Sequence, residues 1–79
     1  MKRAYNDDFN VVINAIYDSF RNLGKDNYQA NSEKGIIEWQ DTVIKVIKNR
    51  KKTHVFINNE SSFSRALLDE ISICLGVNK

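Results

Sequence analysis

Four of the five residues from 48 to 52 are basic, Lys48, Arg50, Lys51 and Lys52. They form the densest cluster of charged side chains in the sequence. Ammonium and guanidinium groups neutralise phosphates, and Lys45 and His54 on the flanking segments would extend such a patch. A basic turn also keeps a hairpin in water, and the formal net charge of the chain is only +2. The cluster therefore has two interpretations, a solvated turn or contact with the phosphates of a nucleic acid.

The residues that could catalyse a reaction or bind a metal are not spaced in the sequence as a catalytic or metal site requires. His54 is the only histidine and Cys74 the only cysteine, whereas a metal site needs several converging ligands. Cys74 falls on the apolar stripe of a predicted helix, which indicates a buried, reduced thiol. Asp7-Asp8 and Asp69-Glu70 are adjacent in helical segments, where neighbours point away from each other. The sequence therefore predicts no catalytic residue, no metal and no cofactor, and a protein that is not an enzyme.

Length and composition predict one globular domain spanning residues 1–79. The chain is 42% hydrophobic and 28% charged, which is ordinary for a folded soluble domain. Lys2 and Arg3 are not followed by an apolar segment, and the longest apolar runs have three residues, such as Val11-Val12-Ile13. Because a secretion signal or a membrane span needs a much longer run, we expect a cytoplasmic protein with no membrane partner.

Two segments carry apolar residues at the spacing of an amphipathic helix. The first spans residues 9–23, with Asn6 or Asp7 as its N-cap and Gly24 after its end. The second spans residues 63–75, with Ser61 or Ser62 as its N-cap and Gly76 after its end. Its predicted buried stripe consists of Phe63, Ala66, Leu67, Ile71 and Cys74.

Between the helices, four short segments are predicted as strands, at residues 28–30, 35–40, 42–47 and 53–57. The last two flank the polar turn at residues 49–52 and form the strongest predicted hairpin. The sequence therefore predicts an α+β fold in the order α-β-β-β-β-α. Its antiparallel sheet has four strands, with three as the alternative, and both helices pack on one face.

The central hairpin carries more apolar residues than one buried face needs. If Ile44, Val46, Val55 and Ile57 point toward the helices, pleating sends the residues between them to the opposite face. A sheet with one wet face should be polar on that side. Trp39, a bound apolar ligand or a second subunit would then cover it, unless scattered surface apolar residues explain the pattern. The predicted partner or ligand face consists of Val43, Lys45, Ile47, His54, Phe56 and Trp39.

The order of landmarks resembles a known family. A helix led by Phe9 and closed by Leu23-Gly24, a turn at Lys34-Gly35-Ile36, strands at residues 42–46 and 53–57 and a final helix are similar to the helix-grip repeats of the BamC outer-membrane assembly lipoprotein. Small bacterial domains of unknown function share this pattern. The resemblance implies the architecture and not an activity, and the chain has no lipid-attachment cysteine near its start.

The element order is also similar to that of the double-stranded RNA-binding domain. Lysines at the start of the last helix grip phosphates in that family, whereas residues 58–65 here offer Arg65 and Glu60. The sequence thus predicts a small interaction or ligand-binding domain that uses the open sheet face, with an unknown protein or a second copy of itself as partner. A nucleic-acid-binding domain acting through the basic turn at residues 48–52 is the alternative.

Overall fold

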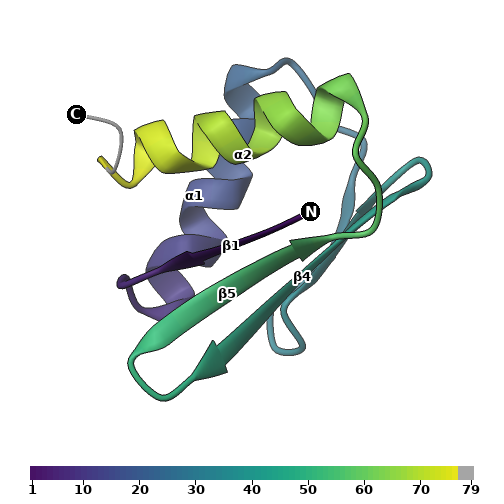
Figure 1. Ribbon diagram of the computed structural model, residues 1–79. Helices are drawn as coiled ribbons and strands as arrows, with labels where there is room; N and C mark the ends of the chain where they lie inside the picture. Colours follow the sequence, from purple (N-terminus) through teal and green to yellow (C-terminus); the bar gives the residue numbers. More distant parts are fainter. Residues whose placement is uncertain (77–79) are drawn as a thin grey trace.

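Two helices and five strands make up the part of the chain that the structure describes (Figure 1). The structure is a computed structural model that describes residues 1–76. The elements are β1 (Lys2–Tyr5), α1 (Phe9–Asn22), β2 (Gln29–Asn31), β3 (Ile36–Trp39), β4 (Thr42–Asn49), β5 (Lys52–Ile57) and α2 (Ser62–Cys74). Both helices lie on the same side of the sheet, which gives the molecule two layers (Figure 1).

The strands form one antiparallel sheet in the order β1-β5-β4-β3-β2. The predicted α+β class is confirmed, but the predicted number of four strands, or three, is wrong. The additional strand is β1, which pairs with β5 at the edge of the sheet and places Lys2 opposite Phe56 and Tyr5 opposite Thr53. β1 has four residues, two of them basic, so it lacks the apolar run by which a strand is recognised in a sequence.

The core lies between the helices and the face of the sheet that they cover. α1 and α2 contribute side chains at the helical spacing, and alternate residues of the strands meet them. The core residues that are at most 1% exposed include Val12, Ile16, Phe20, Ile37, Ile44, Val55, Leu67, Leu68 and Ile71. Val46 and Ile57 are also buried, so the inward-facing set predicted for the central hairpin lies in the core.

The starts of the helices differ in how well their sequences cap them. Asp8 is the N-cap of α1 in place of the predicted Asn6 or Asp7, and its side chain makes no capping hydrogen bond. Ser61 is the N-cap of α2, and its hydroxyl accepts a hydrogen bond from the Ser64 backbone N–H at 3.1 Å. The N-cap predicted for the second helix is therefore confirmed, and that for the first is wrong.

The buried side of α2 is rotated from the predicted stripe. Ala66 and Cys74 are exposed, whereas Ser64 and Ser72 are buried. A buried serine is tolerated where its hydroxyl is hydrogen-bonded, and both serines have such partners. The predicted buried thiol at Cys74 is wrong because these serines, rather than Ala66 and Cys74, lie on the inner side of the helix.

β1 is attached to α2 through side chains. The Arg3 guanidinium donates to the Ser72 hydroxyl at 2.8 Å, and the buried Tyr5 hydroxyl lies 3.0 Å from the same oxygen. Arg3 also lies 3.9 Å from the Asp69 carboxylate. The edge strand β1 is thus held in place by its pairing with β5 and by these side-chain contacts with α2.

Candidate binding face

The side of the sheet turned away from both helices is called the outer face. Because strand side chains alternate in direction, it is formed by every second residue of each strand. In the described part of the chain neither helix covers it (Figure 1). Its residues, from β1 across to β2, are Lys2, Ala4, Lys52, His54, Phe56, Val43, Lys45, Ile47, Asn49, Ile36, Glu38, Gln29 and Asn31.

Five of the six residues predicted for a partner or ligand face lie together on the outer face, Val43, Lys45, Ile47, His54 and Phe56. The structure does not bring the sixth, Trp39, to them. Its ring packs against Phe63 with centroids 4.5 Å apart, and the Lys25 ammonium lies 5.1 Å from the ring centroid. Trp39 lies two residues after the buried Ile37, so it points to the same side of β3, toward the helices. Its assignment to the outer face was therefore wrong.

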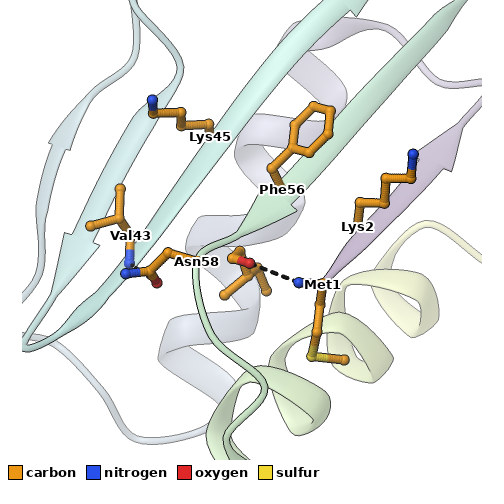
Figure 2. Close-up of a pocket in the computed structure, with 7 residues that line it drawn as sticks. Met1, Lys2, Val43, Lys45, Phe56 and Asn58 are labelled. Carbon is orange, nitrogen blue, oxygen red and sulfur yellow. Dashed lines mark hydrogen bonds between the residues drawn. The ribbon is translucent and has the colours of Figure 1, made fainter.

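A groove of about 390 Å³ opens on the outer face beside the edge strand (Figure 2). Its lining comes from β1, β4, β5 and the residue that follows β5. The lining residues are Met1, Lys2, Val43, Lys45, Phe56, Ile57 and Asn58. Four of the seven lining residues are apolar, Met1, Val43, Phe56 and Ile57, and both charged side chains in the lining are lysines.

Phe56 lies between the two lysines of the groove (Figure 2). Lys2 on β1 and Lys45 on β4 are its direct cross-strand neighbours. Cross-strand pairs on one face have their Cβ atoms about 4.5–5.5 Å apart, so both lysine side chains start beside Phe56, and both lysines are exposed. Phe56 is partly exposed, and this arrangement places two positive charges beside an apolar surface.

Backbone contacts fix the end of the groove where β5 leaves the sheet. The Asn58 side-chain oxygen accepts from the Val43 N–H at 2.8 Å, and the Asn58 N–H donates to the Val43 carbonyl at 3.1 Å. The Asn58 amide also donates to the Asp41 carbonyl at 3.1 Å. Across β5, the Met1 amino group and carbonyl both bond to the backbone of Ile57 at 2.8 Å. These bonds make this end of the groove a fixed part of the sheet.

A second apolar area continues from the groove along the outer face. His54 lies next to Phe56 on β5, with ring centroids 6.2 Å apart and planes inclined by 22°. Ile47 is the cross-strand partner of His54, and it is 50% exposed. Phe56, His54 and Ile47 therefore form a continuous surface of rings and aliphatic carbon.

The basic turn is not a single patch. Lys48 points to the helix side, where its ammonium lies 3.4 Å from the Asp8 carboxylate. Arg50 and Lys51 are exposed in the turn itself, and Lys52 lies on the outer face on the same side of β5 as His54. The four predicted phosphate contacts thus do not all lie on one face, since Lys48 and Lys52 lie on opposite sides of the sheet, and their role in nucleic-acid binding stays a prediction.

Charges on the outer face are unequal. Its basic side chains are Lys2, Lys45 and Lys52, and its one carboxylate is Glu38. Glu38 on β3 lies opposite Val43 on β4, and Glu38 does not line the groove. A partner that closes over the groove therefore meets positive charge on both sides of Phe56.

Groups that could perform chemistry lie apart from one another. His54 is on the outer face, whereas Cys74 is at the end of α2, where Asn22 and Ser19 lie 3.9 Å and 3.8 Å from its sulfur. Within residues 1–76, no group of three or more histidine, cysteine, aspartate or glutamate side chains is placed to hold a metal ion. The outer face is therefore the strongest candidate site, and its chemistry is that of binding.

No protein-family model, curated protein or solved structure matches the chain. The resemblance to the helix-grip repeats of BamC stays a prediction. Among the described residues, no helix combines the length and the apolar character needed to cross a membrane.

Sequence reasoning missed four contributors to the groove, Met1, Lys2, Ile57 and Asn58. Two of them depend on β1, whose pairing with β5 was not predicted. The alternation of Lys2 and Ala4 with Arg3 and Tyr5 was only a weak signal for a strand, because each side of residues 2–5 carries one basic residue. Asn58 carries no comparable signal, since its contact with Val43 depends on the β4–β5 register.

Proposed function

We propose that this chain is a non-enzymatic binding domain whose working surface is the outer face of its sheet. The observation that carries the proposal is the groove of about 390 Å³ beside Phe56 on the face that the helices leave open. Its lining is mostly apolar and includes Lys2 and Lys45, and hydrogen bonds of Asn58 and Met1 hold its end in place. A concave apolar surface with a few polar groups at its edge is the usual form of a binding site.

Structural needs do not account for the apolar residues on this face. The helices already bury the other side of the central hairpin, where Ile44, Val46, Val55 and Ile57 are at most 3% exposed. Ile47 adds nothing to that core at 50% exposure. A contiguous apolar surface rimmed by charge is typical of a contact site rather than of a solvated sheet.

Nuclear magnetic resonance of the ¹⁵N-labelled protein tests the proposal with three probes. The probes are the protein itself over a concentration series, the single-stranded oligonucleotide decathymidine, and an acidic peptide containing leucine. We expect at least one probe to shift amide resonances, with the largest shifts at Val43, Lys45, Ile47 and Phe56. Shifts confined to the helices, or no shift with any probe, would reject the outer face as the working surface.

A pair of matched variants separates the outer face from the rest of the surface. Phe56→Asp places a carboxylate in the groove, and Val11→Asp places one on α1, at a valine that is 47% exposed. We expect the Phe56 variant to lose at least about tenfold in affinity for the active probe and the Val11 variant to lose less than about twofold. Equal losses in the two variants would contradict the proposal.

A further inference from the structure

The charge around the groove identifies the chemistry of its occupant. Lys2 and Lys45 flank Phe56 from the two neighbouring strands, and Lys52 lies further along β5 on the same face. The carboxylate of Glu38 lies outside the groove lining. An occupant that buries Phe56 must pass between ammonium groups, so negative charge on either side of its apolar part complements this site.

A second copy of the chain is a poor match. In a two-fold dimer the same surface patch meets itself. Closing two outer faces around Phe56 would bring the ammonium groups of Lys2 and Lys45 in one copy close to those in the other. Like charges placed together in an interface oppose association, so the charge pattern disfavours self-association through this face.

A nucleic acid supplies negative charge but matches the apolar part less well. Bases stack on aromatic rings, and His54 and Phe56 are the rings of this face. Val43 and Ile47 offer aliphatic carbon instead, and Lys48 is paired with Asp8 on the opposite side of the sheet. Aliphatic side chains of a partner match Val43 and Ile47 better than stacked bases do.

We infer that the outer face binds an extended acidic peptide segment with two apolar residues two positions apart. This inference rests on the proposed function and names the partner of that surface. Alternate side chains of an extended peptide point the same way and lie roughly 7 Å apart. The Phe56 and His54 positions on β5 have the same two-residue spacing, so one apolar residue enters the groove and the other covers Ile47. Acidic residues at both ends of the segment then reach the three lysines.

The test uses the blocked peptide Glu-Glu-Leu-Ser-Leu-Glu-Glu as probe. One comparison peptide replaces every glutamate with lysine, and a second replaces both leucines with serine. Each is titrated into the full ¹⁵N-labelled chain while the amide resonances of the outer face are followed. We expect saturable shifts at Val43, Lys45 and Phe56 with the probe, and affinity at least about tenfold weaker for either comparison peptide.

Charge reversal on the protein provides the matched variants. Lys2→Glu with Lys45→Glu reverses the two lysines of the groove, and Lys51→Glu with Arg65→Glu makes the same change in net charge at exposed positions in the turn and on α2. We expect the first pair to weaken probe binding at least about tenfold and the second to weaken it less than about threefold. Because all four side chains are surface groups, the undisturbed resonances of the core report that each variant remains folded.

The inference is overturned if the lysine peptide binds as tightly as the probe, or if both variant pairs lose affinity equally. Shifts at the outer face with decathymidine or with rising protein concentration, and none with the peptide, would overturn it while leaving the outer face as a binding surface. If none of these probes shifts the amide resonances of the outer face, both the inference and the proposed function are overturned.

Discussion

Gly35 lies at the start of β3, where two parts of the fold approach closely. Its φ is +67°, and a Cβ at this position would collide with the Val46 carbonyl oxygen and meet the Phe9 ring at 3.0 Å. We expect Gly35→Ala to lower the free energy of unfolding by about 3 kcal/mol, from a strained backbone and a forced shift of β4. Urea denaturation measures the loss.

Gly24 provides the matched control for this prediction. Its φ is +73°, but a Cβ there would meet nothing within 4 Å. Gly24→Ala should therefore cost only the backbone term, about 1 kcal/mol. Equal losses at the two glycines would mean that the approach of Gly35 to Val46 contributes nothing to stability.

Arg50 adopts a positive φ of 60° in the two-residue turn between β4 and β5. This conformation costs a residue with a side chain about 1 kcal/mol and suits glycine. We expect Arg50→Gly to raise the free energy of unfolding by about 0.5–1 kcal/mol, read from the urea midpoint. Lys51→Gly, at the neighbouring exposed position, should not raise it. A loss of stability in the Arg50 variant would show that the arginine side chain makes a contribution larger than the strain.

At the scale of elements, β1 depends on α2 as well as on β5. Ser72 accepts from Arg3 at 2.8 Å and lies 3.0 Å from the Tyr5 hydroxyl. We expect Ser72→Ala to lower the free energy of unfolding by about 1–3 kcal/mol, because the buried Tyr5 hydroxyl loses its partner. Hydrogen exchange of the β1 and β5 amides should become faster. Ser62→Ala, at an exposed serine of the same helix, is the control and should leave that exchange unchanged.

A double-mutant cycle separates this bond from general packing. Tyr5→Phe removes the hydroxyl that Ser72→Ala leaves without a partner, so the double variant should lose less stability than the sum of the two single losses. Strict additivity would show that the Tyr5 and Ser72 hydroxyls are not coupled.

Elements with a strong periodic pattern of apolar residues were predictable from the sequence. The edge strand β1, which has no such pattern, was not. The sequence predicted both helices and the central hairpin because their apolar residues recur at the spacing of one face. β1 was not predicted because Tyr5 is its one buried residue. Its strand partners and hydrogen-bond partners lie between 48 positions (Tyr5 to Thr53) and 69 positions (Arg3 to Ser72) further along the chain. Cys74 and Trp39 were misplaced for a related reason, since the side of an element that is buried depends on what packs against it.

At the scale of the whole molecule, three of the seven residues that line the groove were predictable from the alternation of strand side chains alone. Alternation in β4 and β5 placed Val43, Lys45 and Phe56 on one face before any contact was known. The groove itself could not be predicted from the sequence, because Lys2 and Met1 reach it only through the pairing of β1 with β5.

The outer face also predicts the oligomeric state of the whole molecule. We expect light scattering at low ionic strength to give the monomer mass of 9.2 kDa even at millimolar concentration, because a two-fold contact would oppose Lys2 and Lys45 to their own copies. Salt shortens the reach of this repulsion to about 3 Å at 1 M, so attraction between molecules should increase as salt is added.

Neutralising the lysines tests whether their charge is the cause. The double variant Lys2→Gln with Lys45→Gln keeps most of the side-chain length and removes the repulsion, so it should self-associate at a lower concentration than the unmodified chain. Lys51→Gln with Arg65→Gln removes the same charge elsewhere and should not. A dimer of the unmodified chain at low salt that Phe56→Asp dissociates would show that the apolar surface around Phe56 outweighs the lysines. The natural occupant of the face would then be a second copy rather than an acidic segment.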